Sequence, residues 1–209
     1  ASGGQGVVYL AEDTALGRQV ALKLLHPLAS LSDVGAARLR REAEAMSRIE
    51  HPGICSIFHA DLECDPPYLA MRYVPGTSLA TILDEIRSGK RAAPSWRDSV
   101  ELVERLARAA HVAHEAGIVH RDLKPGNVQV TPSNVPVLLD FGIALGRGDE
   151  AGPTRTGDLL GTPSYMAPEQ LDAGRGAVTR RTDVHALGAI LFECLTARPP
   201  YAAPTRAAL

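Results

Sequence analysis

Lysine is scarce in this sequence of 209 residues. Only Lys23, Lys90 and Lys124 are lysines, although the chain has 22 basic residues. Because arginine fills almost every other basic position, each lysine is a candidate for a role that arginine does not serve. Two of the three, Lys23 and Lys124, lie within motifs described below.

Cysteine and net charge are also low. Cys55, Cys64 and Cys194 are an odd set without C-x-x-C spacing, which argues against a disulfide framework and a zinc cluster and favours a reducing, cytosolic setting. The 22 basic and 24 acidic residues give a formal net charge of -2. We therefore expect no electrostatic binding of nucleic acid.

Long apolar runs are missing. The longest, from Val184 to Leu195, is interrupted by His185 and Glu193 and is far shorter than the about 20 residues that cross a bilayer. We expect no membrane contact from this segment. The chain starts without Met or a signal peptide and stops without a closing element, so we expect a fragment cut at both ends.

The first part of the chain shows strand patterns around one helix. Strands are predicted at 7–10, 19–25, 54–60 and 68–74, and a helix is predicted at 33–50. After the turn residues Pro75 to Ser78 the patterns become helical, with helices predicted at 95–116 and 180–197. The stretch 141–168 has neither periodicity and is predicted to be a functional loop.

A glycine-rich start and a lysine-bearing strand indicate phosphate binding. Gly3, Gly4 and Gly6 match the later part of G-x-G-x-x-G-x-V, in which backbone N–H groups approach phosphate, although glycines in a hairpin turn are often only turn formers. The strand Val20 to Lys23 follows and matches V-A-I-K.

An ammonium group on an apolar strand requires a counter-charge, and the helix predicted at 33–50 offers one. Leu39, Glu42, Met46 and Ile49 share one face of this helix, whereas Glu44 points away. Glu42 is therefore predicted to pair with Lys23. The alternative is that Glu42 is a solvated helix residue and the register differs slightly.

Three further motifs follow in order. They are His120-Arg121-Asp122-Leu123-Lys124-Pro125-Gly126-Asn127, then Asp140-Phe141-Gly142, then Ala167-Pro168-Glu169. These match H-R-D-L-x-x-x-N, D-F-G and A-P-E. With this set the sequence resembles the serine/threonine protein kinase family, in its bacterial eukaryotic-like (Hanks-type) branch, from residue 1 to about residue 201.

The resemblance implies an α+β, two-lobed protein kinase-like fold. One partial kinase domain would occupy 1–209, with a small antiparallel sheet and one helix in the N-lobe and hinge (1–74) and a mainly helical, incomplete C-lobe (75–209). The missing helices would supply an arginine for Glu169. We expect a buried, unpaired carboxylate there, and hence a poorly stable or inactive fragment.

The resemblance also implies the catalytic residues. Asp122 would orient the substrate hydroxyl, Lys124 would steady the transferred phosphoryl group, and Asn127 and Asp140 would hold Mg²⁺, for which Mn²⁺ can substitute. Lys124 and Thr162 are the family's marks of serine or threonine specificity. Asp183 would brace the catalytic loop through backbone N–H groups.

The nucleotide site is implied in the same way. ATP would be bound by residues of the glycine-rich start, the following strands and the hinge, namely Gly3, Gly4, Gly6, Val8, Ala21, Lys23, Met71, Tyr73, Val74 and Gln129. Gln129 departs from the family's usual aliphatic residue beneath the adenine, and Arg72 replaces an acidic residue. A hydrophobic column of Met46, Ile57, His120 and Phe141 would link the lobes.

Regulation is implied by Arg121, which in this family pairs with a phosphate on the activation loop. Thr154 and Thr156 are the candidate acceptors, and the alternative is that they are ordinary loop residues. A kinase dimer could carry out the autophosphorylation in trans. The expected partners are ATP and a protein with a serine or threonine acceptor. Many bacterial relatives have a membrane anchor with the kinase on the cytoplasmic side, and the resemblance leaves this open for the parent chain.

Two other functions are compatible with parts of this pattern. A pseudokinase would bind nucleotide as a scaffold without transfer, but Lys23, Asp122 and Asp140 are all present. A small-molecule kinase of related fold would normally lack Ala167-Pro168-Glu169. His111 and His114 share a helical face, yet without a third ligand a structural role is favoured over metal binding.

Overall fold

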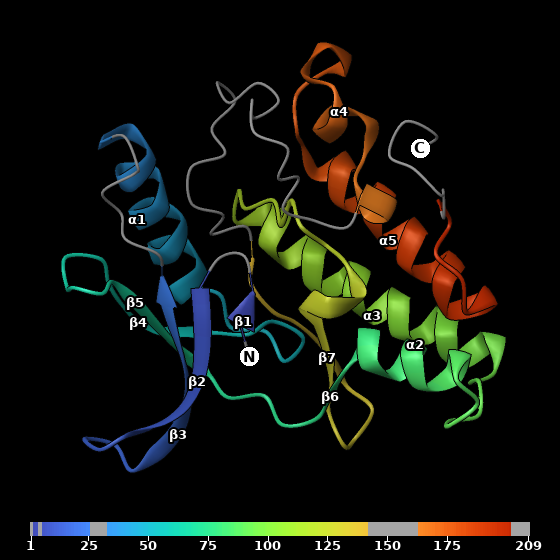
Figure 1. The fold of residues 1–209 in the computed structure, drawn as a ribbon. Helices are drawn as coiled ribbons and strands as arrows, with labels where there is room; N and C mark the ends of the chain where they lie inside the picture. The colour runs from blue at the N-terminus through green and yellow to red at the C-terminus, as the bar shows by residue number, and fades with distance from the viewer. Residues whose placement is uncertain (1, 4–5, 26–32, 142–162, 202–209) are drawn as a thin grey trace.

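The computed structural model describes residues 2–3, 6–25, 33–141 and 163–201 (Figure 1). The first part is a five-stranded antiparallel sheet in the order β1-β2-β3-β5-β4. Its strands are β1 (Ser2–Gly3), β2 (Gly6–Asp13), β3 (Arg18–Leu25), β4 (Ile57–Asp61) and β5 (Tyr68–Arg72). Along β5 the side chains alternate, so that Leu69 and Met71 are buried and their neighbours are partly exposed.

The helix α1 (Asp33–Ser47) packs against β4. Leu39, Ala43 and Met46 are buried along one stripe of this helix, as the periodicity predicted, and Ile49 continues the stripe beyond its end. The helix ends three residues before the predicted boundary of 50. The backbone closes there with a tighter turn in which Ile49 N–H donates to Met46 O at 3.2 Å.

The second part is mainly helical (Figure 1). Its helices are α2 (Leu79–Arg87), α3 (Trp96–Glu115), α4 (Pro168–Leu171) and α5 (Arg180–Thr196), with 3₁₀ helices η2 (Pro125–Asn127), η3 (Pro163–Tyr165) and η4 (Ala173–Arg175). The prediction of a helix at 95–116 is confirmed within one residue at each end. Ser95 caps α3 in a capping box with Asp98, which fixes where this helix begins.

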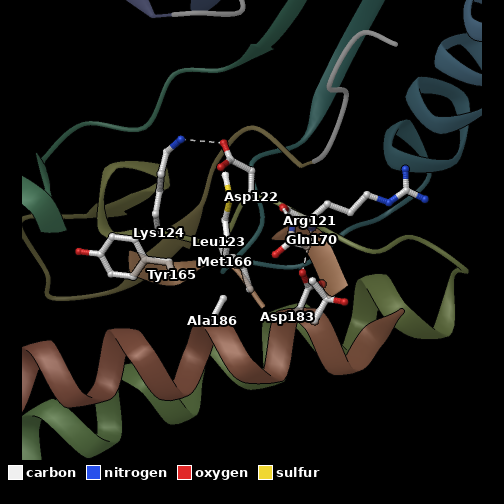
Figure 2. A pocket seen from close by; sticks show the side chains of 10 residues that line it. Arg121, Asp122, Leu123, Lys124, Tyr165, Met166, Gln170, Asp183 and Ala186 are labelled. Atoms are coloured by element: carbon white, nitrogen blue, oxygen red, sulfur yellow. Dashed lines mark hydrogen bonds and ion pairs between the residues drawn. The ribbon is translucent and has the colours of Figure 1, made fainter. Parts of the chain in front are cut away.

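Helices α3 and α5 pack together and form the core of this part. Leu106, Ala109 and Ala113 of α3 and Ala186 and Ile190 of α5 are all buried. The small alanine side chains allow the two helices to approach closely. Helix α5 therefore provides a rigid support for the segments that lie above it in Figure 2.

A small antiparallel sheet packs against α2 and α3. It contains β6 (Thr77–Ser78), β7 (Val128–Val130) and β8 (Pro136–Leu138) in that order. The loop from His120 to Asn127 leads into β7, and Asp140 follows β8. Because β7 and β8 are paired, these two polar segments are held next to each other.

The structure confirms the predicted combination of a small sheet with one helix and a mainly helical second part. The boundary at residue 74 between two lobes stays a prediction. Among the helices of the described ranges, none is long and apolar enough to span a membrane.

Candidate active site

The loop that carries Asp122 is held by a single buried carboxylate. Asp183, in the first turn of α5, accepts hydrogen bonds from His120 N–H at 2.8 Å and from Arg121 N–H at 2.9 Å. His114 Nε2 of α3 lies 2.7 Å from the same carboxylate. The predicted bracing of the loop by Asp183 is confirmed, and His114 has a structural contact, whereas His111 is exposed.

His120 is fully buried and its two ring nitrogens have different partners. Nε2 lies 2.9 Å from Leu139 O, an acceptor, so this nitrogen carries the proton. Nδ1 then accepts from Asp122 N–H at 3.4 Å. Burial lowers the pKa of His120, which favours this neutral form. The imidazole thus links the backbone of Asp122 to the strand end that precedes Asp140.

The predicted hydrophobic column is buried in the structure. Met46, Ile57 and Phe141 belong to one core cluster. The rings of His120 and Phe141 have centroids 4.7 Å apart. The column therefore passes from α1 and the sheet to the loop of Asp122.

Asp122, Lys124 and Asn127 form one polar cluster. Lys124 Nζ lies 2.8 Å from Asp122 Oδ2, and Asn127 Nδ2 donates to the same oxygen at 3.0 Å and to Asp122 O at 2.7 Å. Figure 2 shows Asp122 and Lys124 facing each other above α5. All three side chains are partly exposed, so a substrate can reach them.

Lys23 and Asp140 form the second charged pair of the site. Lys23 Nζ lies 2.8 Å from Asp140 Oδ1, with the lysine side chain 5% exposed and the aspartate 31%. Asp140 adopts a left-handed backbone conformation with φ of 50°, which is uncommon for a residue other than glycine. This ion pair therefore joins β3 of the first sheet to the segment that follows β8.

The side-chain oxygen atoms of Asn127 and Asp140 suit a divalent cation. Asn127 Nδ2 is occupied by Asp122, which leaves the amide oxygen as the ligand atom, and Asp140 offers a carboxylate. Mg²⁺ prefers such oxygen ligands and usually takes one or two protein carboxylates together with phosphates and water. The oxygen atoms of Asn127 and Asp140 therefore fit an ion whose other ligands would be phosphates and water.

Three of the predicted ATP-binding residues, Val8, Ala21 and Met71, lie on β2, β3 and β5. Val8 is opposite Lys23 and Ala21 is opposite Met71 in the sheet register. Gly6 has φ of 143°, and a Cβ atom there would lie 2.0 Å from Leu24 O. Only glycine therefore fits where the glycine-rich start meets β3.

The predicted hinge and floor residues are accessible. Tyr73 is 39% exposed, and Val74 and Gln129 are partly buried. Gln129 lies in β7 opposite Val137. The unusual Arg72 donates from Nη2 to Pro52 O at 3.0 Å, so its guanidinium group is directed to the loop that precedes β4.

Glu42 lies on α1 as its spacing predicted, with 24% of its side chain exposed, whereas Glu44 is 64% exposed. Its carboxylate lies 3.4 Å from Arg121 Nη1, and Figure 2 shows the Arg121 side chain extending away from Asp122 toward the helix. The pairing of Glu42 with Lys23 stays a prediction.

Sequence reasoning missed a polar network beside Tyr165. Glu193 of α5 is 2% exposed; it accepts from Arg87 Nη1 at 2.8 Å and forms a short hydrogen bond with the Tyr165 hydroxyl. Burial and this contact raise the pKa of Tyr165. A glutamate within the mostly apolar stretch from Val184 to Leu195 was the signal for it in the sequence.

The expectation of a buried and unpaired Glu169 is wrong. Glu169 is partly exposed, and its Oε1 accepts from Thr182 Oγ1 at 2.6 Å. This hydrogen bond lowers the pKa of Glu169. The low stability or activity of the fragment that followed from this expectation stays a prediction. Gly4, Thr154, Thr156 and Thr162 lie outside the described residues.

The fold and this set of residues define a protein kinase domain. Residues 1–208 match the protein kinase domain family, and the chain belongs to it. Serine/threonine-protein kinase PknD of Mycobacterium tuberculosis is 42% identical over 201 residues, which cover 96% of this chain and 29% of PknD. Serine/threonine-protein kinase PksC of Streptomyces coelicolor is 39% identical over 212 residues, covering 99% and 38%.

A solved structure agrees with these relatives. The crystal structure of the Mycobacterium tuberculosis PknI kinase domain superposes with a TM-score of 0.76 at 31% identity, covering 97% of this chain and 73% of that one. The chain is thus a protein kinase domain that is similar in sequence to bacterial serine/threonine protein kinases. It spans less than two fifths of the length of the curated relatives named above.

Proposed function

We propose that this domain transfers the γ-phosphoryl group of ATP to serine or threonine hydroxyls of a protein. The observation that carries the proposal is that the Asp122 cluster lies next to the Lys23–Asp140 pair, since Leu139 N–H, one residue before Asp140, donates to Asn127 O at 2.8 Å. One site then has both an acceptor for a proton and charges for phosphates. Serine/threonine protein kinases with 42% and 39% identity support the same reaction.

Each polar side chain of the site has its own role in this proposal. Asp122 Oδ2 is held by Lys124 and Asn127, so Oδ1 is the atom that would accept a hydrogen bond from the substrate hydroxyl and orient its oxygen toward phosphorus. Lys124 and Lys23 would neutralise phosphate oxygens. Asn127 and Asp140 would hold Mg²⁺, with Mn²⁺ as a substitute, and a bound ion would neutralise charge on the phosphate oxygens.

The assignment is tested by labelled phosphate transfer in the full-length protein, to itself and to a generic acceptor. We expect Asp122→Asn to lower the transfer rate at least about a hundredfold, because the amide does not accept the proton. Asp65→Asn is the matched control, since Asp65 is exposed and lies in the connection before β5. Equal labelling by wild type and Asp122→Asn would refute the transfer, and nucleotide binding without labelling in the wild type would indicate a pseudokinase.

We also propose that autophosphorylation of Thr154 and Thr156 activates the enzyme, with Arg121 as the phosphate ligand and a second kinase molecule acting in trans. Phosphosite mapping of active protein tests this.

A cytosolic location of the domain is supported by its three free cysteines. Burial raises the pKa of Cys55 to about 11 and that of Cys194 to about 12, so both remain protonated at neutral pH.

A further inference from the structure

The side chain of Gln170 joins two segments that are far apart in the sequence. Its Oε1 accepts from Ala167 N–H at 3.0 Å, and its Nε2 donates to Arg121 O at 2.6 Å. Because the partners are an obligate donor and an obligate acceptor, only this orientation of the amide satisfies both. Figure 2 shows Gln170 next to Arg121, below Asp122.

The peptide group between Arg121 and Asp122 is consequently held from both sides. Its carbonyl accepts from Gln170 Nε2 at 2.6 Å, and its N–H donates to His120 Nδ1 at 3.4 Å. Arg121 itself has φ of 66°, a conformation that costs free energy for a residue with a side chain and persists only when its surroundings enforce it. The direction of the Asp122 side chain depends on this peptide plane.

The contacts of Gln170 also reach the segment that follows Tyr165. Ala167 N–H is bound by the side chain of Gln170, and Ala167 O accepts from Gln170 N–H at 2.9 Å. Tyr165, Met166 and Gln170 line a pocket with Asp122 and Lys124 (Figure 2). The Gln170 side chain therefore connects the segment that ends at Ala167 with the peptide group between Arg121 and Asp122.

We propose that Gln170 is a positioning residue for phosphoryl transfer, acting through the carbonyl of Arg121 to hold Asp122 in its reactive orientation. The proposal rests on the proposed function of Asp122. Gln170 touches neither nucleotide nor acceptor in this role. It sets the geometry of the group that does, and a misplaced catalytic group slows the transfer step without weakening ATP binding.

A purely structural role at the start of α4 makes a different prediction. Glutamate is as good as glutamine at the third helical position, because its carboxylate also accepts from the capping N–H. It does not donate to a carbonyl when it is ionised. Gln170→Glu therefore keeps the contact to Ala167 and removes only the contact to Arg121.

The experiment compares single-turnover transfer rates of the full-length wild type, Gln170→Glu and Gln170→Met at saturating ATP. Positioning predicts a rate about tenfold lower in Gln170→Glu, as for the loss of one hydrogen bond, with an unchanged KM for ATP. Gln170→Met, which loses both contacts, should be impaired at least as much. Gln19→Glu, an exposed site on β3, is the control for the added charge.

Each result decides between the two roles. A wild-type rate in Gln170→Glu with a loss in Gln170→Met would overturn the proposal, since it shows that only the cap matters. If Gln170→Glu does not fold, an unchanged transfer rate in Gln170→Met overturns the proposal. An inactive wild type would instead contradict the proposed function.

Discussion

At the scale of single residues, His120 connects stability to pH. Its imidazole is fully buried and neutral, so its pKa in the folded state is below the ordinary value of 6.5. Above pH 6.5 neither state binds a proton there, but below it the unfolded chain does and the folded chain does not. Stability is therefore lost as the pH falls from about 6.5 toward the lowered pKa, by up to about 1.4 kcal/mol per pH unit.

This prediction is checked by urea unfolding of wild type and His120→Gln between pH 7.5 and pH 5.5. The wild type should lose stability more steeply than the variant below about pH 6.5, because groups that titrate in both proteins cancel. NMR titration of the ring in the folded wild type gives an independent measurement. An imidazole that titrates near 6.5 would contradict the buried, neutral state.

At the scale of elements, Glu193 ties α5 to α2 and to η3. The Glu193 side chain is 3% exposed and that of its cation, Arg87, 37%. Removing the cation leaves a buried carboxylate whose remaining side-chain partner among the described residues is the Tyr165 hydroxyl. The partial exposure of Arg87 screens part of the loss. We expect Arg87→Ala to lower the free energy of unfolding by about 1–3 kcal/mol, measured by urea unfolding.

The matched control for this prediction is Arg91→Ala. Arg91 pairs with Glu85 at 2.9 Å, but neither side chain is buried, since they are 46% and 34% exposed. Such a surface pair contributes about 0–1 kcal/mol. Equal effects of the two variants would show that burial of Glu193 adds nothing to the pair.

Elements also show what the sequence could and could not predict. Periodicity located α1 and α3, and the motif letters located Asp122, Lys124, Asn127 and Asp140. The predicted strand at 54–60 instead begins at Ile57. Ile54 forms a parallel bridge with Leu138, where Cys55 N–H donates to Leu138 O at 2.9 Å. A run of apolar residues does not reveal which of two sheets it will join.

The contacts of Gln170 and Glu193 escaped prediction for a related reason. Both side chains bind groups that lie 49 and 28 residues away in the sequence. Their partners include a backbone carbonyl, which carries no residue-specific signal. Local patterns do not encode such contacts, because they depend on how α5 and the loop of Asp122 pack together.

At the scale of the whole molecule, the two parts are joined near the site by backbone and side-chain contacts. Leu138 N–H donates to Gly53 O at 2.9 Å, Lys23 pairs with Asp140, and Arg121 Nη1 lies 3.4 Å from Glu42 Oε1. The last contact is long for a charge-assisted hydrogen bond. Arg121 is therefore held only weakly by α1 and is available to a stronger anion.

A phosphate on Thr154 or Thr156 would be that anion. It carries about -1.5 to -2 charges and three acceptor oxygens, and a guanidinium group can bind two of them at once. Phosphorylation should then draw Arg121 from Glu42. We expect autophosphorylated wild type to transfer phosphate about tenfold faster or more than the same protein after phosphatase treatment, because charge-assisted hydrogen bonds contribute about 1.5–3 kcal/mol.

The role of Arg121 is isolated by the ratio of the two rates rather than by either rate alone. Arg121→Gln should bring the ratio of phosphorylated to dephosphorylated activity close to one, whatever its absolute activity, because the amide carries no charge for the phosphate. The double variant Thr154→Ala with Thr156→Ala should behave like the dephosphorylated wild type. An unchanged ratio in Arg121→Gln would show that the phosphate acts through another cation, and full activity of the double variant would show that neither threonine is the switch.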